Sequence, residues 1–318
     1  MPQQQEAHPV VAAKVNPSNR RLGTRTSLGL RTAYQLLRVV PGTRDFRRDL
    51  RDAAWLSEAD ATVISFPKSG RTYLRAMLAR LYQRKFGVDE RDLLDFARLR
   101  HLSSPVPRLL FTHAGDAMRR PDEIRVDPST YSRAPIVLLA RHPGDIAVSR
   151  YHHLKHRSSN RARRRLAEQP LEDFVWTDHG GIPSIVTFLN GFAAMPDVTV
   201  IRYRDLVDDP APSLHKIAAT IGLNVDLDDI LDAVDFGRLP NLRRLEQTGY
   251  FRSKRLRPAD ARDAQSGKVR KGTTGGYRTE LPPSVAAAVD AYIADNLDPK
   301  LDLGTVLVNT AIGSTYAA

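Results

Sequence analysis

Cysteine is absent from this chain of 318 residues, and so are long apolar runs. The lack of cysteine excludes disulfide scaffolds, thiolate zinc sites and cysteine nucleophiles. No apolar run approaches the ~18 residues that a membrane-spanning helix needs. The first 27 residues also lack the uninterrupted apolar stretch of a secretory signal. We therefore expect a soluble, cytoplasmic protein without a transmembrane segment.

Acidic residues are in deficit, with 36 Asp and Glu against 48 Lys and Arg and a formal net charge of +12. Such a balance suits an anionic ligand, a nucleic acid or an acidic surface, although a solvated basic surface explains it equally well. Aromatic residues make up only 7% of the chain, which offers no stacking platform for bases. A basic nucleic-acid-binding protein stays open as an alternative because of the run at 156–165 (HRSSNRARRR).

Short runs rich in β-branched and aromatic residues alternate with helical patterns along the chain. We predict strands at 61–66, 108–113, 135–140 and 198–203. Helices are predicted to begin near Arg71, at Pro143 and at Pro212, the last of these running to about Ile221, and a final helix covers 284–297. This alternation predicts an α/β fold with a central, mainly parallel β-sheet flanked by helices on both faces. Ligands of such folds bind beyond the carboxyl ends of the strands.

The sequence predicts one domain that follows an N-terminal extension. Residues 1–55 are predicted to form a partly disordered N-terminal extension, with a short docking helix at 28–40, and residues 56–318 to form one domain. Two basic stretches, 156–165 and 252–276, are predicted to be surface loops.

The segment SFPKSGRTYLRAML (65–78) carries the most chemistry. A strand ends, a tight turn follows and a helix begins, so free backbone N–H groups at the helix start form an anion cradle. Gly70 lets the backbone approach an oxyanion, Ser69 and Thr72 add hydroxyl donors, and Lys68 adds a cation. The pattern is not a Walker A loop, because the lysine precedes the glycine. An ordinary strand–turn–helix junction with a surface lysine is the alternative.

Two later segments could also contact an anion. In IVLLARHPGDIAVSRYHH (136–153), Arg141 ends a strand and offers a planar fork that matches a phosphate, with Ser149 about two turns into the next helix. A structural ion pair between Arg141 and Asp145 is the alternative. The segment GKVRKGTTGGYRTEL (267–281) is glycine-rich and basic, and such a loop can close over a bound anion; a flexible basic loop without a function is its alternative.

These three segments together resemble the PAPS-dependent sulfotransferases, where PAPS is 3′-phosphoadenosine 5′-phosphosulfate. FPKSGRTYL (66–74) resembles the family's 5′-phosphosulfate loop, 141–149 its 3′-phosphate element, and 270–275 its late R-K-G-x-x-G element. The resemblance covers about residues 60 to 300 and implies a single P-loop-like domain. It implies PAPS as sulfuryl donor, 3′,5′-adenosine bisphosphate (PAP) as product, and no metal. The implied donor-binding residues are Lys68, Ser69, Gly70, Arg71, Thr72, Arg141, Ser149, Arg270, Lys271 and Gly272.

The resemblance also implies a catalytic base and an adenine site. FTH (111–113) resembles the family's K-T-H segment, in which the histidine is the base, so His113 is implied to be catalytic together with Lys68. Phe111 stands where the family has lysine, and our hypothesis is that Arg71 supplies the missing cation. Side chains implied or expected to stack on adenine are Tyr73, Tyr203 and, with a core role equally open, Phe236. His142, His152 and His153 are expected to be surface or supporting residues.

A P-loop-type nucleotide phosphotransferase is the other enzymatic alternative, but it requires a Walker A lysine and a magnesium carboxylate that the sequence does not display. The acceptor is expected to be a small molecule or a glycan, bearing a hydroxyl or an amine, and no specific nucleic acid is expected as partner. Neither the identity of the acceptor nor the oligomeric state can be inferred from these residues.

Overall fold

The computed structural model describes residues 52–96, 106–115, 118–158, 161–257 and 274–303, together with residues 32, 50, 99, 267 and 272. Two of the expected donor-binding residues, Arg270 and Lys271, lie outside the described residues. So do nearly all of the N-terminal extension and of the expected docking helix at 28–40. Predictions for these segments therefore stay predictions.

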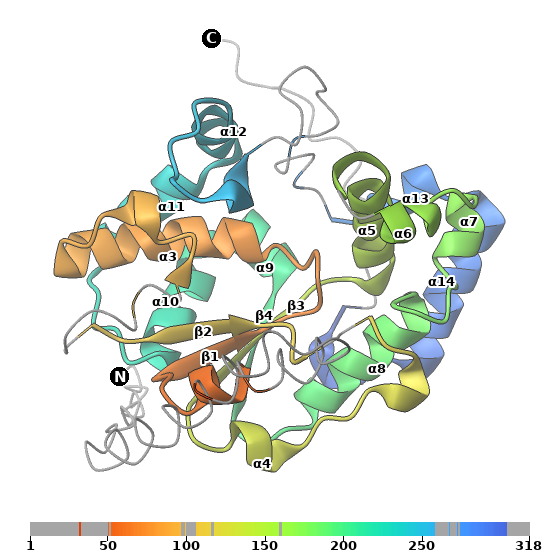
Figure 1. Cartoon of the computed structure of the whole chain (residues 1–318), viewed down its shortest axis with the longest axis horizontal. Helices are drawn as coiled ribbons and strands as arrows, with labels where there is room; N and C mark the ends of the chain where they lie inside the picture. The colour runs from red at the N-terminus through yellow and green to blue at the C-terminus, as the bar shows by residue number, and fades with distance from the viewer. Residues whose placement is uncertain are drawn as a thin grey trace, which may run out of the picture.

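A parallel four-stranded sheet forms the centre of the molecule, with the strand order β2-β1-β3-β4 (Figure 1). All three strand pairings are parallel. The expected α/β fold and the four expected strands are confirmed, each slightly shorter than the sequence run that predicted it. The strands are β1 (Ala61–Ile64), β2 (Leu109–Thr112), β3 (Ile136–Ala140) and β4 (Val198–Arg202).

Alternate side chains of the strands enter two separate apolar cores. Ile64 and Leu138 pack on one face of the sheet with residues of α5 (Pro143–Arg157), α8 (Ile182–Ala193) and α14 (Pro283–Asn296). Val63 and Leu139 pack on the other face with residues of α3 (Arg71–Phe86), α10 (Pro210–Thr220) and α11 (Leu227–Gly237). In Figure 1 these two groups of helices lie on opposite sides of the sheet. Burial on both faces explains why the strands read as continuous apolar runs.

The larger helices connect and cover the strands. They are α3 (Arg71–Phe86), α5 (Pro143–Arg157), α8 (Ile182–Ala193), α10 (Pro210–Thr220), α11 (Leu227–Gly237), α12 (Leu239–Gln247) and α14 (Pro283–Asn296). Shorter helices are α4 (Pro128–Tyr131), α6 (Arg161–Arg165), α7 (Leu171–Phe174), α9 (Tyr203–Asp208) and α13 (Tyr277–Glu280). Single 3-10 turns are η2 (Glu90–Asp92), η4 (Pro121–Glu123), η5 (Lys254–Leu256) and η7 (Pro299–Leu301). No helix in this part of the chain is long and apolar enough to cross a membrane.

Two expectations about the helices are corrected. The helix expected at Pro212 begins at Pro210, which occupies its first turn, where a missing N–H costs nothing. The run at 156–165 is largely helical, because α5 continues to Arg157 and α6 covers Arg161–Arg165. Arginine is a good helix former, and the run contains neither glycine nor proline, so basic composition alone was a poor indicator of a loop.

Candidate functional site

The turn between β1 and α3 has the geometry of an anion cradle. Lys68 has φ 80° and Gly70 has φ 92°, so the backbone twice enters the left-handed region within three residues. α3 begins with no side-chain cap and no acidic residue in its first turn. Its first N–H groups are therefore left for a ligand. Ser69 is fully buried, and among the described residues its hydroxyl oxygen has no hydrogen-bond partner.

Gly70 is required at this turn for two reasons. Its positive φ disfavours any residue with a Cβ. A Cβ added there would also lie 2.2 Å from Cε2 of Tyr203, far inside van der Waals contact. Tyr203 is the first residue of α9, directly after β4, and it is buried. Tyr203, at the end of β4, therefore packs directly against the turn.

Arg141 joins the second turn to the first. Its Nη1 donates a hydrogen bond to the carbonyl oxygen of Lys68 at 3.0 Å, and its guanidinium carbon lies 4.5 Å from the centre of the Tyr203 ring. Arg141 Nε lies 3.9 Å from Asp145 Oδ2, too far for a hydrogen bond. The two turns thus lie against each other at the carboxyl ends of the adjacent strands β1 and β3, as the sequence predicted.

Asp145 has a role that the sequence did not reveal. Its carboxylate accepts hydrogen bonds from the backbone N–H groups of Gly275 at 2.9 Å and Tyr277 at 3.2 Å. Asp145 is buried in the first turn of α5. It therefore anchors the segment that the sequence analysis expected to close over a ligand. Gly272 of that segment has φ 65°, and an added Cβ would lie 2.4 Å from Cδ1 of Leu239.

His142 is buried, so of the two roles expected for it, a surface residue or a supporting residue, the structure favours the supporting one. It caps α5, its Nδ1 accepting a hydrogen bond from the N–H of Gly144 at 3.2 Å. Its ring stacks on Tyr277, with the ring centres 4.5 Å apart. Burial lowers the pKa of His142 to about 4, against the opposing effect of the Asp145 carboxylate. The imidazole is therefore neutral at pH 7 and serves to hold α5 against α13.

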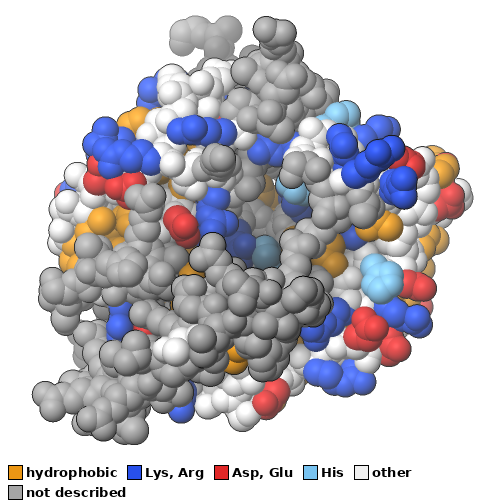
Figure 2. Space-filling model, in the orientation of Figure 1, with side chains coloured by type: hydrophobic (Ala, Val, Ile, Leu, Met, Phe, Trp, Pro, Cys, Tyr) orange, Lys and Arg blue, Asp and Glu red, His pale blue; other side chains and the backbone are white. Residues whose placement is uncertain are grey.

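A cavity of about 910 Å³ opens where these turns meet, and we call it the donor cavity. Its volume lies within the range of small-molecule sites. Figure 2 shows a hollow in the middle of this face, with basic and histidine side chains at its floor. The expected site residues that line it are Lys68, Gly70, Arg71, Thr72, Tyr73, His113, Arg141, Ser149, Tyr203 and Gly272.

Phe236 is the expected adenine contact that the structure does not bring to this cavity. It packs with Tyr250 and Phe251, with Arg80 over its ring at 5.5 Å. Val234, two residues earlier on α11, lines the cavity instead. Two positions along an α-helix rotate the side-chain direction by about 200°, so only one of the two can face the cavity. The core interpretation of Phe236 is the one the contacts support.

His113 follows the end of β2, and both of its ring nitrogens are engaged. Nδ1 lies 2.6 Å from the carbonyl oxygen of Ser65, and Nε2 is hydrogen-bonded by Nη2 of Arg71. A carbonyl can only accept and a guanidinium can only donate. Nδ1 therefore carries the proton, and the lone pair of Nε2 accepts the hydrogen bond from Arg71 at the wall of the cavity.

Arg71 lies where the donor cavity meets a second, smaller cavity of about 300 Å³. Its Nη1 is buried and has no hydrogen-bond partner among the described residues. Burial, and the nearby charge of Arg255, lower the pKa of Arg71 to about 9. The side chain therefore stays charged at pH 7. Four residues line both cavities: Arg71, Arg75, His113 and Arg255.

Two members of this group, Arg75 and Arg255, were not predicted as site residues from the sequence. Arg75 follows Arg71 by four residues on α3, so both point to the same side of the helix. That spacing was a signal that could have found it. Arg255 comes from η5, and no short-range pattern connects it with the site. The described residues contain no group of three or more His, Asp or Glu arranged to hold a metal ion.

Comparison with known proteins gives a consistent set of similarities. The family model described as "Sulfotransferase domain" matches residues 58–300. Cytosolic sulfotransferase 3 of Arabidopsis thaliana is 25% identical over 282 residues, which cover 81% of this chain and 82% of the relative. A 3-alpha-hydroxysteroid sulfotransferase of Cavia porcellus is 21% identical, covering 80% of this chain and 90% of the relative.

A solved structure shares the fold. The crystal structure of retinol dehydratase in a complex with retinol and PAP superposes with a TM-score of 0.53 and 16% sequence identity. The match covers 79% of this chain and 86% of that chain.

Proposed function

This chain belongs to the sulfotransferase family, and from that premise we propose that it transfers a sulfuryl group from PAPS to a hydroxyl or amine of an acceptor. The observation that carries the proposal is the hydrogen bond from Arg141 to the carbonyl of Lys68. It holds two anion-binding turns at one cavity, which is the arrangement that a nucleotide with phosphates at both ends of its ribose requires.

The turn after β1 fits the 5′ end of the donor. The Ser69 hydroxyl has no hydrogen-bond partner among the described residues, and the uncapped start of α3 offers N–H donors that suit an anion. Lys68 adds a cation, and Thr72 lines the same cavity. The retinol dehydratase structure was solved with PAP, which supports the same class of ligand for this shared fold.

The turn after β3 suits the 3′-phosphate. Arg141 and Ser149 line the donor cavity together, and Gly272 of the closing segment lies in its wall. By the resemblance, Arg270 and Lys271 complete this contact. Tyr73 and Tyr203 both line the cavity and are our candidates for the adenine contact. The Tyr203 ring already packs on Gly70 and Arg141. Tyr73 is therefore the better candidate for stacking on the adenine ring.

His113 is the proposed base. The acceptor hydroxyl first replaces Arg71 as the hydrogen-bond donor to Nε2 of His113. As the acceptor oxygen forms its bond to sulfur, Nε2 takes the hydroxyl proton, and the bond from sulfur to the bridging phosphate oxygen breaks. Lys68 and the N–H groups of α3 meet the charge that develops on that leaving oxygen. The hydrogen bond from Nδ1 to the Ser65 carbonyl holds the ring in the required tautomer.

Arg71 is proposed to supply the cation that Phe111 cannot. Its side chain reaches His113 at the junction of the two cavities, where the sulfuryl group passes from donor to acceptor. If Arg71→Ala leaves both PAP affinity and turnover unchanged, this assignment fails.

A transfer assay tests the proposed function. We expect radioactive sulfur from labelled PAPS to appear in a small molecule of a cell extract only when the protein is added, with the product identified by mass spectrometry. The His113→Ala protein serves as the control for label that transfers without catalysis. Equal labelling with and without active protein would contradict the proposal. The cytoplasmic location and the domain limits given above remain predictions.

A further inference from the structure

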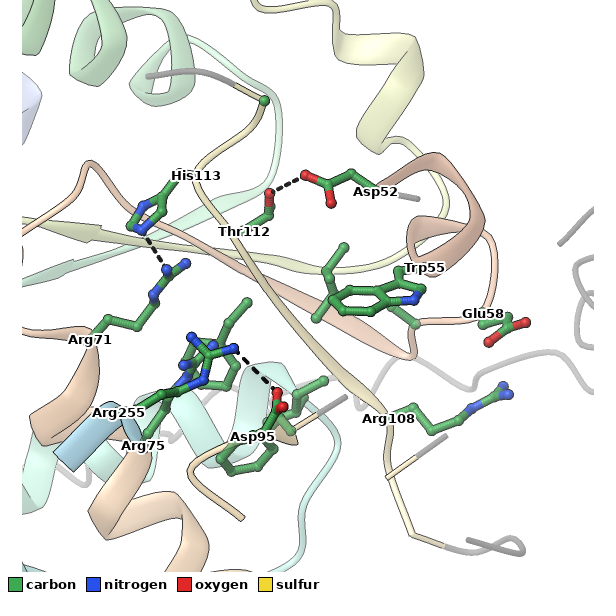
Figure 3. A pocket seen from close by; sticks show the side chains of 16 residues that line it. Asp52, Trp55, Glu58, Arg71, Arg75, Asp95, Arg108, Thr112, His113 and Arg255 are labelled. Carbon is green, nitrogen blue, oxygen red and sulfur yellow. Dashed lines mark hydrogen bonds and ion pairs between the residues drawn. The ribbon is translucent and has the colours of Figure 1, made fainter. Parts of the chain in front are cut away.

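The smaller cavity beside His113 is a compact site with its own lining, and we call it the acceptor cavity (Figure 3). The cavity lies along β2, and its lining includes His113, Phe111 and Leu109. Trp55, Phe96 and Phe111 give it aromatic walls. It meets the donor cavity only at the four residues that line both, so a compound bound here would face the sulfuryl group across His113.

Arg75 is the unusual feature of this cavity. Its side chain is buried at 6% exposure, and its guanidinium carbon lies 4.4 Å from the centre of the Phe111 ring. Its Nε has no hydrogen-bond partner, and no carboxylate lies within ion-pair distance of it, among the residues that the structure describes. Burial, and the charges of Arg71 and Arg255, hold the pKa of Arg75 well below its usual value.

Asp52 and Asp95 offset this cluster only in part, because two carboxylates face the three arginines Arg71, Arg75 and Arg255. Asp52 accepts a hydrogen bond from the hydroxyl of Thr112 at 3.3 Å, and Asp95 accepts a longer one from Arg255 at 3.4 Å. In Figure 3, Glu58 and Arg108 lie at the end of the cavity away from His113. A buried guanidinium without a counter-ion is costly, and the cost is offset when an anion binds. Arg75 therefore keeps room for an anion, because Asp95, the carboxylate that acts on it, is paired with Arg255.

The position of Arg75 indicates which substrate brings that anion. The donor's 5′ end is bound at the turn before α3, whereas Arg75 lies a full helical turn further on, over Phe111. Phe111 precedes His113 by two residues on β2, which separates them by about 7 Å along the strand. Arg75 lines both cavities, but Phe111 lines the acceptor cavity alone. A group that contacts Arg75 beside Phe111 therefore belongs to the molecule whose hydroxyl approaches His113.

We propose that the acceptor is a small hydroxyl compound that carries an oxyanion group, a carboxylate or a sulfate, about 7 Å from the hydroxyl that is sulfated. This inference rests on the proposed sulfuryl transfer and names its substrate class. Arg75 binds the oxyanion, Arg255 adds a second cation from the cavity rim, and the aromatic walls enclose the body of the compound. The hydroxyl then points to Nε2 of His113.

Binding to the PAP-saturated protein tests the inference, because PAP fills the donor cavity. The probes are 4-hydroxyphenylacetate and its amide, 4-hydroxyphenylacetamide, which have the same shape and differ in charge. Calorimetry should show the acid binding at least about tenfold more tightly than the amide, as one charge-assisted hydrogen bond provides. With PAPS in place of PAP, kcat/KM should favour the acid to a similar degree.

Two variants assign the preference to residues. In Arg75→Met the preference should fall below about threefold, while the thermal unfolding midpoint stays equal or rises, because an unpaired buried charge is removed. Arg255→Met, at an exposed side chain, should reduce the preference without risk to folding. Arg244→Met removes an exposed arginine of α12 outside both cavities and should leave the preference intact.

Each contrary outcome has its own meaning. Equal affinity of the wild-type PAP complex for acid and amide overturns the inference, and so does a preference that persists in both Arg75→Met and Arg255→Met. A wild-type protein that does not bind PAP at all overturns the proposed function first, and the inference with it.

Discussion

The donor cavity and the acceptor cavity meet at His113, yet they are built from different parts of the protein. The donor cavity is lined by turns at strand ends, with Lys68, Gly70 and the start of α3 among its lining residues. The acceptor cavity is made almost wholly by side chains, among them Trp55, Arg75 and Arg255. Backbone sites depend on the fold, whereas side-chain sites can change while the fold stays the same.

The residues of the two cavities also differ in how they contact one another. The donor turns are tied to one another, because Arg141 binds the first turn and Asp145 binds the third segment. Changing any of them disturbs the others. Arg75 packs over Phe111, but its Nε has no hydrogen-bond partner among the described residues, so we explain its presence by what it binds. Comparing variants of the two cavities separates these roles.

The largest effect is expected from His113→Ala, since His113 serves both cavities. Turnover should fall by about 10²–10⁴-fold, the usual contribution of a general base, whereas PAP affinity should stay within about threefold. Initial rates with labelled PAPS and calorimetric titration with PAP measure the two quantities. Loss of PAP binding in this variant would make His113 part of the donor cavity alone.

Gly70→Ala should damage the donor cavity selectively. Its Cβ would lie 2.2 Å from Tyr203, so the turn must move, and PAP affinity should fall by about tenfold or more. Gly87→Ala at the other end of α3 is the matched control, because Gly87 also has a positive φ but its added Cβ meets nothing within 4 Å. Gly87→Ala should cost about 1 kcal/mol of stability and leave PAP binding unchanged. Similar PAP affinity in the two variants would contradict the cradle.

A smaller effect is expected from His142, which supports the donor side through Tyr277. Its pKa is lowered from 6.5 to about 4 in the folded protein, so the unfolded chain binds the proton first as the pH falls. Stability from this group is complete above pH 6.5 and is lost between pH 6.5 and pH 4, about 2 kcal/mol of it by pH 5.

Urea unfolding at pH 7 and pH 5 measures that loss. His142→Asn keeps an acceptor at the start of α5 but does not titrate, so its stability should decline by about 2 kcal/mol less than that of the wild type. An equal decline in both proteins would show that His142 is already accessible to protons.

The sequence was a good guide to the donor cavity and a poor one to the acceptor cavity, for physical reasons. Buried strands produce apolar runs, and phosphate turns need glycine and small polar residues at fixed spacing, so β1, β3 and their turns were predictable. Trp55, Arg75 and Arg255 meet only through tertiary packing. Phe236 was a candidate for the adenine contact by its position in the sequence, with a core role equally open, and the rotation of α11 points Val234 to the cavity instead.

The central claim is that two turns, after β1 and after β3, hold the two phosphates of one nucleotide. Calorimetric titration with PAP, adenosine 5′-monophosphate and adenosine 3′-monophosphate tests it most directly. We predict that PAP binds at least about 100-fold more tightly than either monophosphate, because each turn supplies charge-assisted hydrogen bonds to one phosphate, and that Arg141→Ala removes most of the advantage of PAP over the 5′-monophosphate. Equal affinity for PAP and the 5′-monophosphate in the wild-type protein would contradict the account.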